Sequence, residues 1–300
     1  MAALAPANLK PLFDEAFLRR LETLSLFTRQ RAQGHLRGQH RSKRTGVGMV
    51  FSDFRPYSPG DDTRYIDWGI YMRLDRLLLR LFEEEADLPI YIFVDTSKSM
   101  DFGAPAKFDY ARKLAAALAH ISLLNHDRVS VVAYAQGIVD ALPARRGKNQ
   151  TWRVFKFLEA LAPTGKTSLN AAIRSYFGSS RARGFVVLIS DFLDSGGVEE
   201  PFAILRRYRH DVAVLQVTEP NEESPQLPEE VMLVDAESEV ATEVHVTPGL
   251  LEAYRKAFLE HCEGIEAFCR KYGWSYAQAS TAVSFDDLML KFFREHGVLR

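Results

Sequence analysis

Cysteine, net charge and long apolar runs are all scarce in this chain of 300 residues. It contains two cysteines and carries a formal net charge of −1, so no global field draws it to nucleic acid or to a lipid surface. No apolar run approaches the roughly 20 residues that a membrane-spanning helix needs. The first 17 residues lack the basic start and apolar stretch of a secretory signal. We therefore expect a cytoplasmic protein with no membrane span and no nucleic-acid partner.

The two cysteines, Cys262 and Cys269, lie in a segment whose apolar spacing predicts a helix. Two turns of helix would place them on one face, roughly 10 Å apart along the axis, which is too far for a disulfide. Their spacing is not that of a zinc knuckle either. We expect two buried, reduced thiols, as is usual for a cytoplasmic protein.

Familiar catalytic motifs are also missing. The sequence has neither the Gly-x-Ser-x-Gly of a nucleophile elbow nor the His-Glu-x-x-His of a zinc protease. The tetrapeptide Gly-Lys-Thr-Ser at 165–168 ends like a phosphate-binding loop. However, the first glycine of that motif would fall at Ala160, inside a predicted helix and with no strand before it. We predict that the protein is not an enzyme.

From residue 90 onward, apolar runs typical of buried strands alternate with segments of helical periodicity. The run at 90–94 (Ile-Tyr-Ile-Phe-Val) is β-branched and aromatic, as in a strand buried on both faces of a parallel sheet. The alternation predicts an α/β fold over residues 89–300, with a doubly wound, mostly parallel sheet of the Rossmann type. Strands of this sheet are expected at 90–95, 129–135, 137–145, 185–190, 211–217, 232–235, 243–246 and 275–279, and helices at 108–124, 152–161, 169–177, 199–208, 248–272 and 285–295.

Residues 1–88 are expected to form an N-terminal extension, with one helix and a turn-rich β segment. Apolar spacing predicts an amphipathic helix at 14–27 and strands at 50–57 and 77–85. The intervening residues 29–44 are rich in Lys and Arg. They form either an anion-binding arm or a solvated connector.

Two of the predicted buried strands end in an aspartate, Asp95 and Asp191. Asp95 opens an Asp-x-Ser-x-Ser turn, and the loop at 163–169 supplies a threonine. Because ligands of open α/β sheets bind at the carboxyl ends of the strands, we expect these groups to meet in one crevice. Carboxylate and hydroxyl oxygens suit Mg²⁺ or Ca²⁺ rather than Zn²⁺. The predicted metal ligands are Asp95, Ser97, Ser99, Thr167 and Asp191.

Two alternatives stay open at this site. The hydroxyls after Asp95 could serve only to cap the helix that follows, as Ser and Thr often do. In the second loop, Thr164 is a rival to Thr167 for the threonine position.

In order and spacing, these residues resemble the metal-ion-dependent adhesion site of von Willebrand factor A domains. That site uses Asp-x-Ser-x-Ser after the first strand, a threonine in a later Gly-Thr loop, and an aspartate after the fourth strand. The resemblance implies a von Willebrand factor A-like fold over residues 89–300. It also implies that a bound ion, Mg²⁺ or else Ca²⁺ or Mn²⁺, completes its shell with an acidic side chain of a protein partner.

A dense set of charges lies at 55–68, where the sequence reads Arg-Pro-Tyr-Ser-Pro-Gly-Asp-Asp-Thr-Arg-Tyr-Ile-Asp-Trp. Pro59 presets one backbone dihedral and Gly60 accepts a positive one, which predicts a turn. The Arg and Asp side chains form either a local network that stiffens this turn or a surface that binds a partner.

The segment 46–85 resembles the signature of a bacterial family whose genes accompany MoxR-type AAA+ ATPases. The family hallmark is similar to Arg-x-Tyr-x-Pro-Gly-Asp-Asp-x-Arg-x-Ile-Asp-Trp, and residues 55–68 match it at each fixed position. The resemblance implies a cytoplasmic partner of such an ATPase that acts in chaperone-like maturation of client proteins. The partner-binding residues that it implies are Arg55, Asp61, Asp62, Arg64, Asp67 and Trp68.

The combined prediction is a non-enzymatic, metal-dependent protein-binding module. One alternative is a scaffold whose metal site stays empty. The other is a magnesium-dependent phosphohydrolase with Asp95 as its nucleophile, but that motif has a second aspartate where Ser97 stands.

Overall fold

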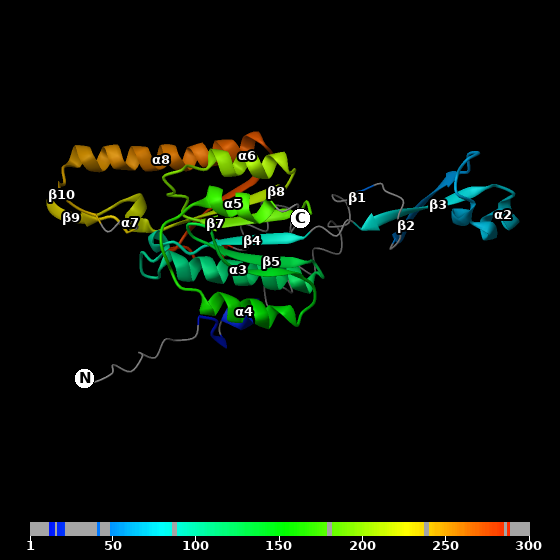
Figure 1. The fold of residues 1–300 in the computed structure, drawn as a ribbon, viewed down its shortest axis with the longest axis horizontal. Helices are drawn as coiled ribbons and strands as arrows, with labels where there is room; N and C mark the ends of the chain where they lie inside the picture. The colour runs from blue at the N-terminus through cyan, green and yellow to red at the C-terminus, as the bar shows by residue number, and fades with distance from the viewer. Residues whose placement is uncertain are drawn as a thin grey trace. The chain divides into compact units, whose positions relative to one another are not determined.

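The computed structural model describes residues 12–15, 17–21, 41–42, 49–85, 89–178, 182–236, 240–284 and 287–288. The chain divides into two compact units. The smaller unit is residues 31–87, and the larger one combines residues 1–30 with 88–300. Figure 1 shows the elements of both.

A six-stranded sheet with the order β11-β8-β7-β4-β5-β6 forms the centre of the larger unit. Neighbouring strands are parallel except for β5 and β6, which form an antiparallel hairpin. The coarse prediction of an α/β fold with a mostly parallel, Rossmann-like sheet is therefore confirmed. The strands are β4 (Ile90–Asp95), β5 (Val129–Tyr134), β6 (Ile138–Arg145), β7 (Phe185–Ser190), β8 (Asp211–Thr218) and β11 (Ser275–Ser280).

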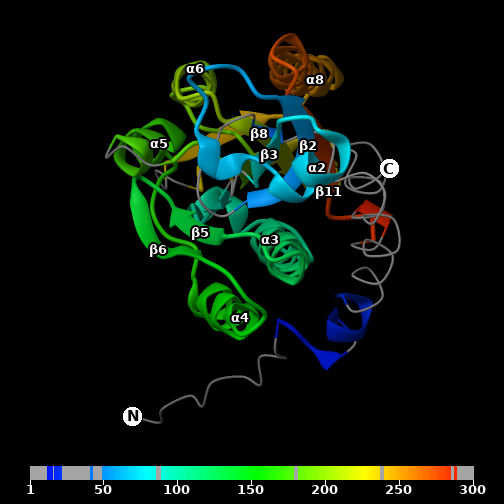
Figure 2. The same cartoon turned by 90° about the vertical axis from the view of Figure 1, so that its right-hand side faces the viewer.

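Helices cover both faces of this sheet, α3 and α4 on one side and α5, α6 and α8 on the other (Figure 2). Alternate residues of β4 enter the two cores: Ile92 and Val94 join the α3 side, whereas Tyr91 and Phe93 join the α5 side. The strand is apolar from Ile90 to Val94 because neither face meets water, and it ends in the buried Asp95. The helices of this unit are α3 (Lys107–Leu124), α4 (Gln150–Ala160), α5 (Leu169–Phe177), α6 (Glu199–Arg207), α7 (Pro220–Glu223) and α8 (Pro248–Lys271), with a short 3₁₀ turn, η2 (Lys98–Met100).

The expected N-terminal extension is divided between the two units. Phe13, Phe17 and Leu21 are buried in the core on the α3 side, and the ring of Phe13 stacks on that of Phe155 at 4.8 Å. Residues 1–30 therefore belong with the larger unit. The predicted helix at 14–27 is described as far as residue 21, the helix at 285–295 only at 287–288, and the basic segment at 29–44 only at 41–42.

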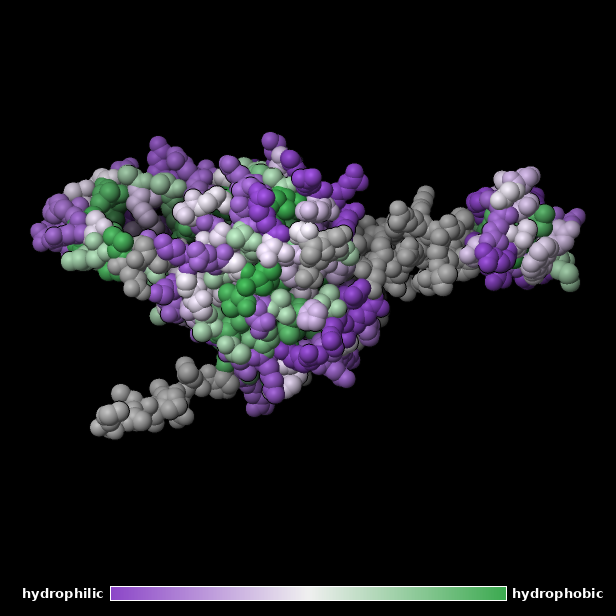
Figure 3. Space-filling view, viewed as in Figure 1, coloured by the Kyte–Doolittle hydropathy of each residue, from purple (hydrophilic) through white to green (hydrophobic). Residues whose placement is uncertain are grey.

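The prediction that residues 232–235 and 243–246 complete the central sheet is wrong. They fall largely in β9 (Glu230–Val234) and β10 (Ala241–His245), which among the described strands pair with each other as a separate antiparallel hairpin. Met232 and Val234 on β9 are both 61% exposed. Figure 3 shows apolar surface at the end of the unit that carries this hairpin. The apolar residues that led to the prediction of a buried strand therefore lie on an exposed strand, β9. The short helix α7 follows β8.

Cys262 and Cys269 both lie in α8, and both are buried free thiols, as predicted. In the described part of the chain, no helix is long and apolar enough to cross a bilayer.

The smaller unit contains a three-stranded antiparallel sheet in the order β1-β3-β2 and a short helix, α2. Its elements are β1 (Arg41–Ser42), β2 (Met49–Pro56), η1 (Thr63–Tyr65), α2 (Trp68–Leu74) and β3 (Leu78–Glu85). Asp67 begins α2: its Oδ1 accepts a hydrogen bond from the N–H of Ile70 at 3.0 Å, and its Oδ2 accepts one from Nε of Arg80 at 2.8 Å. These two bonds lower the pKa of Asp67, the bond from Ile70 more strongly. One carboxylate therefore caps the helix and ties it to β3.

His210 is the buried imidazole that precedes β8. Its Nδ1 accepts a hydrogen bond from the N–H of Gly184 at 3.1 Å, and its ring lies 4.3 Å from that of Phe177, centroid to centroid. Burial lowers the pKa of His210 below its ordinary value of 6.5. The fold therefore favours the neutral imidazole.

Replacing Asp67 tests the capping role. In Asp67→Ala the amide of Ile70 loses its acceptor, so we expect hydrogen exchange of the amides at 70–74 to speed up by roughly fivefold. Asp67→Asn is the matched control, because asparagine caps helices well but cannot pair ionically with Arg80. Equal acceleration in both variants would show that the Arg80 ion pair, not the cap, holds α2.

The pH dependence of stability tests the buried imidazole. The stabilisation by neutral His210 is present above pH 6.5 and is lost as the pH falls toward its lowered folded pKa, because the unfolded chain takes up the proton first. In His210→Asn an acceptor remains but does not titrate. The difference in unfolding free energy between wild type and variant should therefore shrink below pH 6.5, by at most about 1.4 kcal/mol per pH unit. Urea titrations at pH 7.5, 6.5 and 5.5 measure it, and a difference independent of pH would refute the assignment.

Candidate metal centre

The predicted acidic residues lie at the switch point of the sheet. From β4 the chain continues to β5 on one side, and it later returns to β7 on the other side of β4. Val94 is in register with Ile189, so Asp95 at the end of β4 lies opposite Ser190, and Asp191 follows directly. The spacings of a parallel sheet put the Cα atoms of the two aspartates about 6 Å apart. This edge is where open α/β sheets bind ligands.

Asp95 is fully buried and organises the turn that follows it. Its Oδ1 accepts a hydrogen bond from the N–H of Ser97 at 2.8 Å. The hydroxyl oxygens of Ser97 and Ser99 are 3.0 Å apart. Ser97 is fully buried and Ser99 is half-buried, so the turn reaches solvent at Ser99. The side chain of Ser97 makes no capping bond to η2, which leaves its oxygen directed to the site.

Thr167 comes from the loop at 163–168 and also reaches Asp95. Its Oγ1 donates to the carboxylate and lies 3.3 Å from each carboxylate oxygen. Two backbone bonds hold this loop against the Asp95 turn: Lys98 N–H to Gly165 O at 3.1 Å and Thr164 N–H to Thr96 O at 2.6 Å. Thr164 is exposed whereas Thr167 is buried, which favours Thr167 as the site residue.

Ser190 belongs to the same cluster and was missed by the sequence analysis. Its Oγ donates to Oδ2 of Asp95 at 2.6 Å and accepts from the N–H of Phe192 at 2.9 Å. Its place beside an aspartate at the end of an apolar strand was visible in the sequence. The register that sets it opposite Asp95 was not.

Asp191 is buried and forms an ion pair with a positively charged side chain of the protein. Its Oδ2 accepts from Nζ of Lys107 at 2.8 Å, and its Oδ1 accepts from the N–H of Leu193 at 3.2 Å. Lys107 also forms an ion pair with Glu222 of α7. No sequence motif indicates that Lys107 or Glu222 belongs to the site, since Lys107 lies 84 residues before Asp191 and Glu222 lies 31 residues after it. Only the tertiary structure brings the three together.

The electrostatics of the site follow from burial. Burial raises the pKa of Asp95 to about 6, the neighbouring charge of Asp191 adds to this shift, and hydrogen bonds from Ser190 and Ser97 oppose it. Burial on its own would lower the pKa of Lys107, but Asp191 and Glu222 outweigh it, so that the pKa is raised. Burial raises the pKa of Tyr134 well above its ordinary value, and the charge of Asp95 contributes.

The donor set fits a hard divalent cation. Two carboxylates and three hydroxyls converge at one sheet edge, and such oxygens are the ligands of Mg²⁺ and Ca²⁺. In the described residues no cluster of three or more His, Cys, Asp or Glu side chains forms a metal site. The residues that would hold an ion are Asp95, Ser97, Ser99, Thr167 and Asp191, with alcohol oxygens in the majority.

Two ion pairs form within residues 55–68 of the smaller unit, whereas Asp67 pairs with Arg80 outside this segment. Arg55 binds Asp61 through two bonds of 2.8 and 2.7 Å, and Arg64 binds Asp62 with a shortest contact of 2.6 Å. This is the local network that the sequence analysis considered. Trp68 is 56% exposed at the start of α2. Of the partner-binding candidates, it alone offers a large apolar surface.

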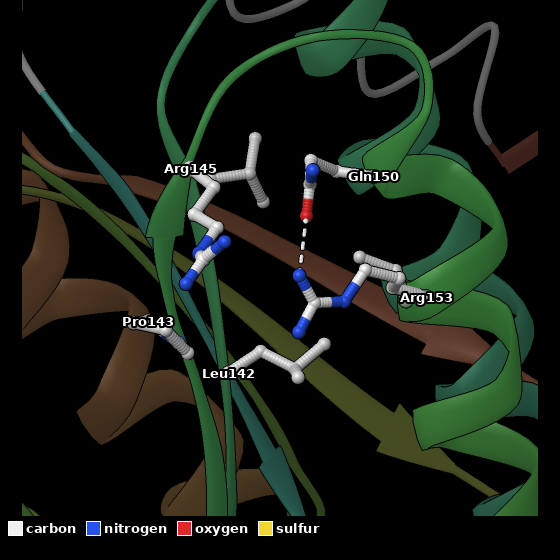
Figure 4. A pocket seen from close by; sticks show the side chains of 7 residues that line it. Leu142, Pro143, Arg145, Gln150 and Arg153 are labelled. Atoms are coloured by element: carbon white, nitrogen blue, oxygen red, sulfur yellow. Dashed lines mark hydrogen bonds between the residues drawn. The ribbon is translucent and has the colours of Figure 1, made fainter.

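A small cavity lies away from the predicted site, between β6 and α4 (Figure 4). Leu142, Pro143 and Arg145 line it from β6, and Gln150 and Arg153 line it from α4. Its volume of about 10 Å³ is the room of a single water molecule. It does not offer a site for a substrate.

Comparison with known proteins identifies relatives of the chain. It is 31% identical over 248 residues to the uncharacterised protein Mb1516 of Mycobacterium bovis and to the uncharacterised protein Rv1480 of Mycobacterium tuberculosis. In both cases the match covers 80% of this chain and 77% of the relative. Among solved structures, it is similar to the conserved hypothetical protein BatB of Bacteroides thetaiotaomicron, with a TM-score of 0.41, 17% identity, and coverage of 70% of this chain and 98% of the other. Residues 53–264 match the profile of a family described as protein of unknown function DUF58, and the chain belongs to that family.

Proposed function

We propose that this protein is a non-enzymatic binding module that uses a divalent cation to recognise an acidic side chain of a protein partner. The observation that carries the proposal is the convergence of Asp95, Ser97, Ser99, Thr167 and Asp191 at the switch point of the sheet. The resemblance of these residues to the adhesion site of von Willebrand factor A domains supports it. Mg²⁺ is the proposed ion, with Ca²⁺ or Mn²⁺ as substitutes.

The chemistry of the donors suits capture of a carboxylate. Hydroxyl ligands are neutral, so a bound Mg²⁺ would keep positive charge with which to attract a carboxylate from outside. A cage of four carboxylates would cancel that charge. Of the five donors, Ser99 is the most accessible, so a partner is expected to approach over Ser99.

The environment of Asp95 argues against an aspartyl phosphohydrolase. A phosphoryl group is much larger than a bare ion and needs open access to an aspartyl nucleophile, but Asp95 is fully buried behind the donors Ser97, Thr167 and Ser190. These contacts orient the carboxylate toward the hydroxyl cluster. They suit a ligand that holds an ion in a fixed position.

A MoxR-type AAA+ ATPase is the proposed partner, and chaperone-like maturation of client proteins in the cytoplasm is the proposed process. The support is the resemblance of residues 46–85 to the signature of the family that accompanies such ATPases. In the smaller unit, the ion pairs of Arg55 and Arg64 stiffen the turn that presents Trp68. We propose that this segment contributes to partner binding and that the metal centre binds the acidic side chain of a client.

Ion binding is tested by calorimetry. We expect Asp95→Asn to weaken Mg²⁺ binding at least tenfold, because the amide keeps the shape of the side chain but removes one of two anionic ligands. Asp101→Asn is the matched control, since Asp101 is a nearby exposed carboxylate outside the donor set. Absence of uptake by the wild type at millimolar Mg²⁺ would instead favour a scaffold whose site stays empty.

Partner capture is tested with the purified MoxR-type ATPase of the same organism. In surface plasmon resonance, Trp68→Ala should weaken its binding at least tenfold, because a large exposed aromatic side chain is typical of a binding hot spot. Met72→Ala, which removes an 86% exposed side chain from the same helix, is the control. Equal losses of affinity in both variants, or no loss in either, would refute the assignment of Trp68.

The non-enzymatic proposal has its own test. Magnesium-dependent hydrolysis of p-nitrophenyl phosphate that is lost in Asp191→Asn would refute it.

A further inference from the structure

Lys107 in the larger unit is a lysine whose side chain is completely buried. It is the first residue of the 18-residue helix α3. Positive charge at a helix N-terminus opposes the helix dipole, and a buried ammonium also loses its hydration. Neither helix formation nor core packing explains a lysine here. Its two carboxylate partners do.

The two carboxylate partners of Lys107 come from different elements of the fold. Asp191, 2% exposed in its side chain, is one of the proposed ion ligands, and Glu222 of α7 is 14% exposed. The N–H of Glu219 donates to the second oxygen of Glu222 at 3.2 Å, which fixes that carboxylate in a capping box. The ammonium is thus held between an ion ligand and a carboxylate that the protein positions for it.

We propose that Lys107 is an internal cation that sets the divalent affinity of the centre. This inference rests on the function proposed above. The ammonium already neutralises part of the charge of Asp191, and it would repel a dication held by Asp95 and Asp191. The centre therefore binds Mg²⁺ weakly on its own, and the carboxylate of a partner supplies the missing negative charge. Lys107 is a positioning and affinity-setting residue, not a ligand.

Glu222 acts in the opposite direction to Lys107. It shares the ammonium with Asp191 and so reduces the positive charge that Asp191 receives. Without Glu222, the ammonium would pair with Asp191 alone, and the centre would lose a nearby negative charge. Binding of Mg²⁺ would then be weaker than in the wild type.

The test uses a charge-balanced pair of variants in the full chain. Lys107→Met combined with Glu222→Gln removes one charge of each sign, so that Glu222 is not left as an unpaired buried charge. Titration calorimetry with MgCl₂ alone should show binding at least tenfold tighter in the double variant than in the wild type. In Glu222→Gln alone, Mg²⁺ binding should be weaker than in the wild type. A purely structural role for Lys107 would not produce this order.

Thermal unfolding gives a second readout. In EDTA the double variant should melt below the wild type, because Asp191 has lost its cation, and millimolar Mg²⁺ should raise its melting temperature more than that of the wild type. Mg²⁺ binding by the wild type without tightening in the double variant would overturn the inference and leave the proposed function standing. Binding of Mg²⁺ by the double variant but not by the wild type would support the inference and overturn the proposal that the wild type binds the ion on its own. Uptake by neither would overturn both.

Discussion

Two carboxylates buried side by side are the constraint around which the larger unit is arranged. Asp95 and Asp191 end neighbouring strands in the middle of the sheet, and neither is more than 2% exposed. An isolated buried carboxylate is strongly destabilising, and two of them also repel each other. Each must therefore find its own compensation within the protein. The two aspartates are compensated in different ways, and this difference determines the chemistry at the carboxyl ends of the strands.

Asp95 is compensated by hydrogen bonds and Asp191 by a cation. Ser97, Thr167 and Ser190 all donate to Asp95, and yet the pKa of Asp95 is still raised to about 6, because burial outweighs these donors. Asp191 receives the ammonium of Lys107. The loops at 96–100 and 163–168 are in turn tied by backbone bonds, so the hydroxyls are fixed before any ligand arrives. Preorganisation of this kind reduces the entropy lost on binding.

The sequence predicted the features that depend on local pattern. Apolar runs located the six strands of the central sheet, and the spacing of the acidic and hydroxyl residues brought Asp95 and Thr167 to one predicted crevice. Features that depend on tertiary contacts were missed or misassigned. The apolar residues of β9 predicted a strand of the main sheet, although Met232 and Val234 are exposed on a separate hairpin. No sequence pattern singled out Lys107, because its two partners, Asp191 and Glu222, are distant in the chain and come from the β7–α6 loop and from α7. Periodicity reports which residues are apolar, not which element covers them.

The choice of ligands at this centre bears on what the proposed function requires. A recognition site must release its partner as well as bind it, so an ion held too tightly and neutralised too fully would be of little use. Neutral hydroxyls and an ammonium on Asp191 both reduce the negative charge offered to a cation. That reduction weakens binding of the ion by itself and strengthens the dependence on a carboxylate from outside. In the proposed centre the ion and the partner would bind as one cooperative unit, because each would supply the charge that the other lacks.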